Sequence, residues 1–165
     1  MTIQDWGAIG ELVGGVAVIV TLIYVALQIR QNTQTIRLST GYSVTEEFRD
    51  IFASLTENSG LCELIYKAAN DATSISGAEK LRFYSFNNNL IRACENAHIQ
   101  STQGVLDPKH WAGMKRMIID FTHMAGFREY WLNRKHWFSE DFQHFMDAEI
   151  LQSDAKAGVP LPGAY

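Results

Sequence analysis

The sequence GAIGELVGGVAVIVTLIYVALQI occupies residues 7–29 and contains one charged side chain, Glu11. A helix of this length rises about 35 Å and therefore crosses a hydrocarbon layer of about 30 Å. Residues 1–6 contain Asp5 but no Lys or Arg, whereas a cleaved signal peptide begins with a basic segment. The stretch predicts a retained transmembrane helix over residues 7–29, preceded by a short extracytoplasmic segment over residues 1–6.

The basic residues nearest this helix predict its orientation. Arg30 and Arg37 are the first basic side chains of the chain, and both follow the apolar stretch. Since basic flanks of membrane helices stay in the cytoplasm, we expect the N-terminus outside and the domain after the helix in the cytoplasm. Membrane lipid is the first partner that this placement predicts.

One face of the predicted helix is lined by small residues. Glycines four apart form a GxxxG pair, which lets two helix backbones approach closely and favours self-association or binding to a membrane protein complex. The alternative is that glycine is simply common in membrane helices. Glu11 either reaches water at the membrane edge, lies protonated or paired at a helix contact, or lines a pore in a homo-oligomer. The predicted helix-packing residues are Gly7, Gly10, Glu11, Gly14 and Ala17.

Residues 30–42 are mostly polar and lack proline, so the helix is expected to continue out of the membrane as a stalk. We expect Gly41 to end or bend this stalk. Ser43 with Glu46 matches a capping box, which predicts that a new helix starts there. The stalk would then join the membrane helix to a separate domain.

Residues 43–152 carry apolar side chains at helical spacing and show no strand alternation. Ser76 and Asp107 predict helix starts, and Gly104 and Gly126 predict helix ends. The segment is therefore expected to contain several short and medium helices with one apolar face each.

The predicted fold class is all-α: an N-terminal transmembrane helix that extends into a stalk, followed by a compact cytoplasmic helical bundle. Residues 153–165 are rich in glycine and proline, and we expect them to form an extended or flexible tail.

Composition limits the function. The net charge is −4, the pI is about 5.7, and the 14 basic residues are dispersed, so nucleic acid is not an expected partner. Cys62 and Cys94 lack CxxC spacing and lie in apolar helical contexts, which predicts buried free thiols. The sequence contains no GxSxG, GxGxxG or Walker A motif, so we expect an interaction protein without a cofactor rather than an enzyme.

The strongest chemical pattern is an acid followed three residues later by histidine. Di-iron and di-manganese bundles use Glu-x-x-His pairs on two helices together with carboxylates from two others. The alternatives are a buried network of hydrogen bonds and a solvated face. The candidate metal ligands under the first interpretation are Glu95, His98, Asp120, His123, Asp141 and His144.

The segment YWLNRKHWF, residues 130–138, combines four aromatic side chains with three basic or imidazole groups. It predicts either core aromatics that alternate with solvated cations, or a surface for a protein partner or the membrane. The candidate partner surface is formed by Tyr130, Trp131, Arg134, His136 and Trp137. Asparagines at 87–89 are poor helix formers, so at least one of them is expected to form a hydrogen bond across helices or to a partner.

Several motifs carry a resemblance to a known family. ALQIRQNT covers residues 26–33, ENAxxQ covers 95–100 and is followed by GxLD at 104–107, and YWLNRKHWFSEDF covers 130–142. In this combination the chain resembles a family of uncharacterised small bacterial single-pass membrane proteins. The resemblance implies the same architecture and a bacterial inner-membrane location, and it assigns no catalytic residues.

The sequence thus predicts a non-enzymatic, single-pass inner-membrane protein that mediates assembly, either as an accessory subunit of a larger membrane complex or as a homo-oligomer. The alternatives are a metal-binding, di-iron-like helical bundle and a homo-oligomeric ion channel.

Overall fold

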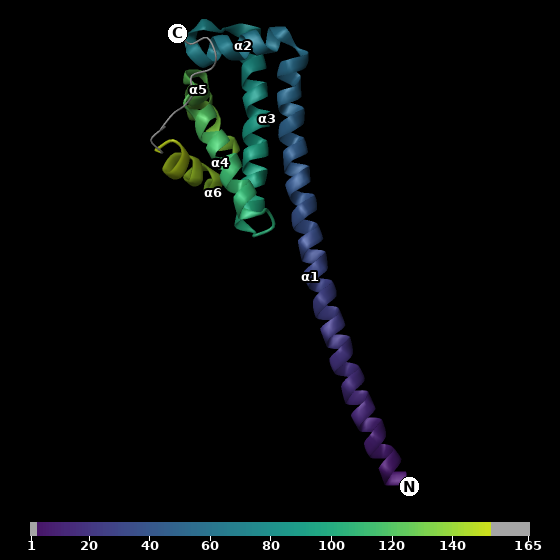
Figure 1. Ribbon diagram of the computed structural model, residues 1–165. Coiled ribbons are helices and arrows are strands. Elements are labelled where there is room, and N and C mark those ends of the chain that lie inside the picture. Colours follow the sequence, from purple (N-terminus) through teal and green to yellow (C-terminus); the bar gives the residue numbers. More distant parts are fainter. Residues whose placement is uncertain (1–2, 153–165) are drawn as a thin grey trace. The chain divides into compact units, whose positions relative to one another are not determined.

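The computed structural model describes residues 3–152, apart from the side chains of residues 4, 5, 8 and 9. These residues form six α-helices and no strand, which confirms the all-α prediction (Figure 1). The expected tail over residues 153–165 lies outside the described residues. The α-helices are α1 (Ile3–Glu57), α2 (Ser59–Asn70), α3 (Gly77–Thr102), α4 (Pro108–Thr122), α5 (Ala125–Arg134) and α6 (Glu140–Phe145). The shorter turns are η1 (Ala72–Ser74), η2 (Lys135–Trp137) and η3 (Met146–Ile150).

Contacts divide the chain into two compact units, residues 1–39 and residues 40–165. Helix α1 contributes to both. The expected break at Gly41 is wrong, because α1 runs through this residue and Thr45 Oγ1 donates to Gly41 O at 2.8 Å within the helix. A glycine inside a helix costs only about 0.5–1 kcal/mol. The burial of Val44 and Phe48 in the second unit outweighs that cost, so the capping pattern at Ser43 is not used.

The second unit encloses one hydrophobic core to which every α-helix contributes. Phe52 of α1 stacks on Phe121 of α4 with ring centroids 5.4 Å apart. Aromatic side chains dominate the deepest layer, where Trp131 and Phe142 meet edge to face. Such rings bury a large apolar area each, which explains how short helices form a stable unit. The largest fully buried side chains are Trp131, Tyr130, Phe127, Phe142, Leu90 and Ile91.

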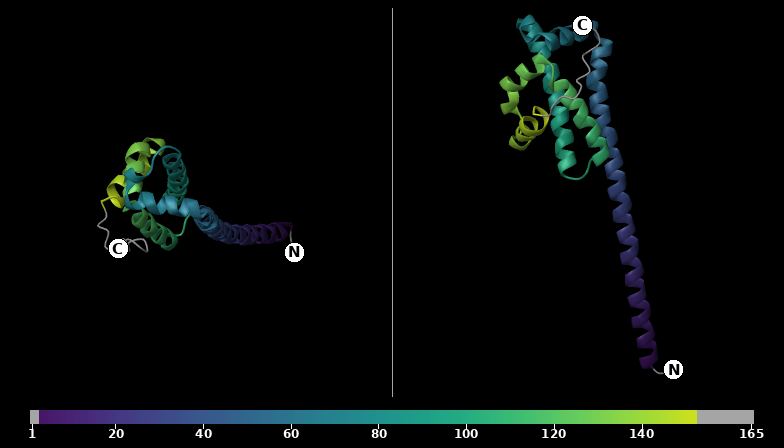
Figure 2. Two further views of the ribbon diagram at one scale, coloured as in Figure 1. Left: turned by 90° about the horizontal axis from the view of Figure 1, so that it is seen from above. Right: turned by 60° about the vertical axis from the view of Figure 1, so that its left-hand side comes forward.

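Two helix boundaries follow directly from the sequence. Asp107 caps α4, since its side chain accepts from the backbone N–H of Lys109 at 2.8 Å. Gly104 ends the turn after α3 with φ of +69°, a conformation that favours glycine. Helices α3 and α4 lie side by side and antiparallel across this turn (Figures 1 and 2). Ser76 precedes α3 as predicted, but its side chain forms no capping hydrogen bond. The Glu79 side chain pairs with Lys67 at 3.2 Å.

The prediction that Gly126 ends a helix is wrong. Helix α4 ends at Thr122, and Gly126 lies in the first turn of α5. A Cβ atom at this position would lie 2.5 Å from Ala68 O and 2.8 Å from Phe83 Cζ. Glycine is required here because the backbone of α5 packs directly against the end of α2.

Candidate functional site

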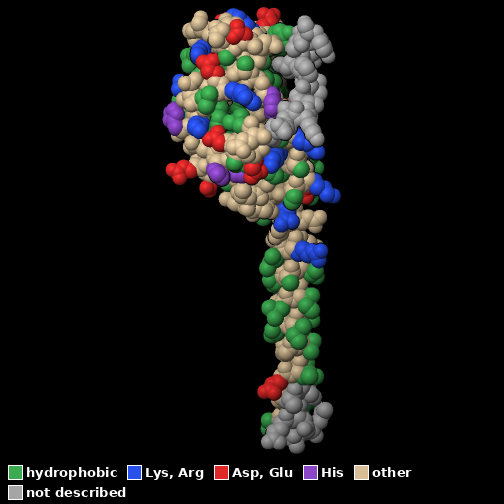
Figure 3. Space-filling model, turned by 90° about the vertical axis from the view of Figure 1, so that its left-hand side faces the viewer, with side chains coloured by type: hydrophobic (Ala, Val, Ile, Leu, Met, Phe, Trp, Pro, Cys, Tyr) green, Lys and Arg blue, Asp and Glu red, His purple; other side chains and the backbone are tan. Residues whose placement is uncertain are grey.

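The N-terminal part of α1 presents a continuous apolar surface. It belongs to the one helix of residues 3–152 that is long and apolar enough to cross a membrane, and none of its most apolar stretch is buried. Leu12, Leu22 and Ile29 are each more than 60% exposed. Figure 3 shows hydrophobic side chains following one another along this segment. A core helix of a water-soluble protein would cover such side chains; here they are free to contact lipid or another helix.

Two polar side chains of this segment donate hydrogen bonds within the helix. Thr21 Oγ1 donates to Ala17 O at 2.8 Å, and Gln28 Nε2 donates to Tyr24 OH at 2.8 Å. Lipid offers no hydrogen bonds, so internal pairing of this kind suits a membrane helix. Among the predicted helix-packing residues, Gly7, Gly10 and Gly14 have open space where a Cβ would lie. Association through this face stays a prediction.

The candidate partner surface on α5 and η2 is only partly exposed. Tyr130 and Trp131 are buried, at 0% and 1% exposure, so including them in a surface was wrong. They face the core, where Trp131 Nε1 donates to Asp147 Oδ1 at 2.8 Å. Arg134 is half-buried, whereas His136 and Trp137 are exposed. For the two buried rings, the interpretation as core aromatics is the correct one.

The second unit has a groove between α3 and the end of α5. Its volume is about 460 Å³. Helix α3 supplies one wall with side chains four residues apart, and α5 and η2 supply the other. We call this the α3–α5 groove; it is lined by Gly77, Lys80, Leu81, Tyr84, Ser85, Asn88, Asn89, Arg134 and Trp137.

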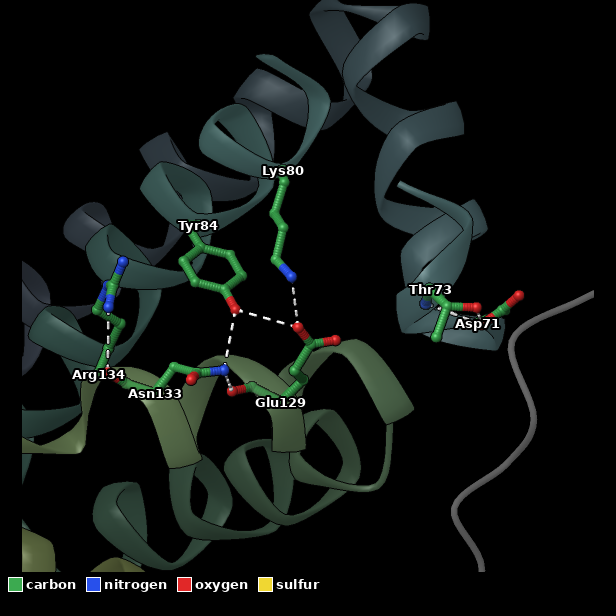
Figure 4. Close-up of polar contacts among 7 residues, drawn as sticks. All are labelled: Asp71, Thr73, Lys80, Tyr84, Glu129, Asn133 and Arg134. Atoms are coloured by element: carbon green, nitrogen blue, oxygen red, sulfur yellow. Dashed lines mark hydrogen bonds and ion pairs between the residues drawn. The ribbon is translucent and has the colours of Figure 1, made fainter. Parts of the chain in front are cut away.

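A network of hydrogen bonds fixes Tyr84 in this wall (Figure 4). Glu129 Oε1 accepts from Lys80 Nζ at 2.6 Å and from the Tyr84 hydroxyl at 3.4 Å. Asn133 Nδ2 donates to Tyr84 OH at 3.3 Å and to Glu129 O at 2.8 Å. The Tyr84 ring also meets Tyr130 edge to face, with centroids 5.2 Å apart. The aromatic wall of the groove is therefore held rigidly.

Arg134 lies at the end of α5, where the two walls meet. Its guanidinium carbon lies 5.4 Å from the Tyr84 ring centroid and 4.9 Å from that of Trp137. Nη1 donates to Asn133 O at 3.2 Å, as Figure 4 shows. Cation–π contacts on both rings hold the planar group in place.

Asn88 confirms the expectation for the asparagines at 87–89. Its Oδ1 accepts from the Tyr130 hydroxyl at 3.4 Å, which is a hydrogen bond between α3 and α5. Asn87 is buried and donates to Phe83 O in its own helix at 2.9 Å. Burial raises the pKa of the Tyr130 hydroxyl to about 12, so this group remains a donor at neutral pH.

The three acid-x-x-His pairs do not assemble a metal site. Within residues 3–152, no group of three or more His, Cys, Asp or Glu side chains is placed to hold a metal ion. His98 stacks on Phe145 at 4.2 Å between ring centroids, and burial lowers its pKa. His123 Nδ1 lies 2.6 Å from Ile119 O in its own helix. The remaining ligand candidates, Asp120, Asp141 and His144, are exposed.

Glu95 instead forms a structural link. Its carboxylate is 6% exposed, pairs with Arg92, and accepts from the backbone N–H of Ser139 at 2.7 Å. Arg92 also donates to Trp137 O at 3.3 Å. The pair therefore ties α3 to the segment that connects η2 and α6, which matches the expected alternative of a buried network of hydrogen bonds.

Replacing Glu95 with Ala is expected to lower the free energy of unfolding by about 2–4 kcal/mol, because the Ser139 N–H and Arg92 lose their buried acceptor. Chemical denaturation of the full chain in detergent measures this. Glu46→Ala, which removes an exposed pair with Arg49, is the control and should change stability by less than about 1 kcal/mol. Equal effects of the two substitutions would contradict a structural role for Glu95.

The two cysteines differ in exposure. Cys94 is buried in α3, and burial raises the pKa of its thiol. Cys62 is exposed, so the expectation that both thiols are buried was wrong for this residue. The buried face of α2 is formed by Leu61, Leu64, Ile65, Ala68 and Ala69, and Cys62 lies outside it.

Sequence reasoning did not identify Lys80, Tyr84 and Glu129 as members of a site. The available signal was the spacing of Lys80, Tyr84 and Asn88, which puts a cation, a phenol and an amide on one face of α3. The partner helix that completes the groove was not deducible from that spacing.

Comparison with known proteins gives no relative: no family model, curated protein or solved structure matches this chain.

Proposed function

We propose that the protein is a non-enzymatic, single-pass protein of a bacterial inner membrane that mediates assembly, as a homo-oligomer or as an accessory subunit of a larger membrane complex. The N-terminus lies outside and the helical unit from residue 40 onward lies in the cytoplasm. The first part of α1 spans the membrane and provides the contact between subunits.

One observation carries the proposal: the apolar side chains of α1 from Gly10 to Ile29 are exposed along the helix. Lipid covers such a surface, and basic residues after it favour a cytoplasmic location of the following unit. Small residues at 7, 10, 14 and 17 share one face, and the three glycines among them have open space where a Cβ would lie, which suits close approach of a second helix. These features together support association within the membrane.

The assembly role is tested by purifying the protein in a mild detergent and measuring the protein mass of the protein–detergent complex. We expect more than one copy of the chain, or a defined second protein in constant ratio. A monomer that purifies with nothing else would contradict the proposal.

Gly14→Leu and Gly15→Leu give a matched comparison for the helix face. Both glycines have open space around them, but only Gly14 belongs to the small-residue face. A leucine at Gly14 prevents close approach of two backbones. We therefore expect it to raise the dissociation constant of the assembly by at least about tenfold, which shifts the measured mass toward the monomer. Gly15→Leu should leave the mass unchanged, and an equal effect of both would contradict the proposed face.

A further inference from the structure

Arg134 differs from the other half-buried cations of the described residues. Lys80, Arg92, Lys115 and Lys135 each have a carboxylate oxygen within 4.0 Å. Within residues 3–152, no carboxylate lies that close to the Arg134 guanidinium. Removing a cation from water is unfavourable unless a counter-charge compensates for it. Arg134, the half-buried cation without such a partner, lies in the wall of the α3–α5 groove.

The guanidinium of Arg134 lines the groove and is held there by its neighbours. The rings of Tyr84 and Trp137 form cation–π contacts with the guanidinium, and its Nη1 donates to Asn133 O. Nε is buried and has no hydrogen-bond partner among the described residues. An arginine has five N–H donors in a planar fork that matches the two oxygens of a carboxylate or phosphate. Donors on the Nη atoms therefore remain for a ligand.

The charge of the groove favours an anion. Among the described residues, the groove lining contains two cations, Lys80 and Arg134, and no acid. Lys80 is neutralised by Glu129 at 2.6 Å. Arg134 therefore leaves the groove with a local positive charge, although the whole chain carries a net charge of −4. Attraction of an anion here arises from the local arrangement and not from the overall charge.

The other lining side chains indicate what accompanies the anionic group. Leu81 and Trp137 are 71% and 51% exposed, so the rim offers apolar and aromatic surface. Ser85, Asn88 and Asn89 add neutral polar groups along α3. A volume of about 460 Å³ lies in the range of small-molecule sites.

We propose that the α3–α5 groove binds a small organic oxyanion, a carboxylate or phosphate attached to an aromatic or apolar group. Arg134 binds the oxyanion through its Nη donors, and Trp137 with Leu81 contacts the apolar group. Lys80, Glu129 and Asn133 position Tyr84, which in turn positions Arg134. This binding site is independent of the assembly role proposed above.

Titration of the full-length protein in non-ionic detergent tests the site, with three probes of similar size: benzoate, phenyl phosphate and neutral benzyl alcohol. Ligand-observed NMR gives each dissociation constant. We expect at least one anion to bind at least tenfold more tightly than benzyl alcohol, and the better anion identifies the headgroup. Equal binding of all three, or no binding of either anion below about 10 mM, would overturn the proposal.

Arg134→Gln should weaken binding of the preferred anion by about tenfold to hundredfold, because a charge-assisted hydrogen bond is lost. Arg128→Gln is the control, since Arg128 lies exposed on the same helix and outside the groove. Equal affinity of Arg134→Gln and the wild type would overturn the proposal. In the wild type, the indole N–H resonance of Trp137 should shift on titration more than that of buried Trp131. This measurement needs no variant. A larger shift for Trp131 than for Trp137 would also overturn the proposal.

Discussion

Replacing Val16 and Ile19 with Asp is expected to remove the protein from the membrane fraction. Both side chains are more than half exposed in the middle of the apolar part of α1. Each Asp near the centre of a membrane helix costs about 2.5–3.5 kcal/mol of insertion free energy, so two cost about 5–7 kcal/mol. Alkaline carbonate extraction, with detection of the protein in pellet and supernatant, measures the result.

Ile36→Asp with Leu38→Asp is the matched control for this experiment. Ile36 and Leu38 lie on the same helix with closely similar exposure, 54% and 59%, but outside the apolar stretch. The control should remain in the membrane fraction, because its charges lie in the predicted stalk. Retention of both double variants in the pellet would contradict a membrane-spanning role for α1, as would release of both.

Gly126→Ala is expected to lower the melting temperature of the helical unit by roughly 5–15 °C. The added Cβ would lie 2.5 Å from Ala68 O, and that oxygen belongs to backbone and moves only if α2 and α5 separate. Overpacking of this kind costs about 1–3 kcal/mol or more. Thermal unfolding of the full chain in detergent, followed by circular dichroism, measures the change.

Gly113→Ala provides the comparison. Gly113 also lies within a helix, α4, and a Cβ there meets no atom within 4 Å. Alanine should raise stability by about 0.5–1 kcal/mol, since it favours the helix more than glycine does. If Gly126→Ala were as harmless as Gly113→Ala, the close approach of α5 to α2 would be contradicted.

The helices could be predicted from the sequence because their signals are local. Apolar spacing identifies the buried face of α2 through Leu61, Leu64 and Ile65, and Asp107 marks the start of α4 through its cap. These features depend on neighbours within four residues. The all-α fold and the apolar N-terminal helix follow from them.

The errors arise where distant segments decide the outcome. Gly104 and Gly126 both follow an apolar helical run, yet only Gly104 has positive φ; Gly126 is required by Ala68, far away in the sequence. Burial of Val44 and Phe48 carries α1 past Gly41, which local rules treat as a break. Tertiary packing overrides local preference in both places.

The candidate site shows the same division. Lys80 and Tyr84 share a face of α3, and the sequence reveals that spacing. From α5, Arg134 completes the groove and Glu129 accepts hydrogen bonds from Lys80 and Tyr84. The pairing of these helices depends on core packing around Tyr130. The acid-x-x-His pattern was misleading because spacing alone does not reveal that His98 packs among aromatic rings.

The unequal exposure of the two cysteines gives the wild-type protein a single thiol suited to chemical labelling. Cys94 is enclosed in the core with a raised pKa, whereas Cys62 is open to solvent at the start of α2. A membrane-impermeant maleimide therefore reacts with native protein only from the side on which Cys62 lies. Labelling in intact cells compared with inverted membrane vesicles reports the orientation of the chain without any engineered tag.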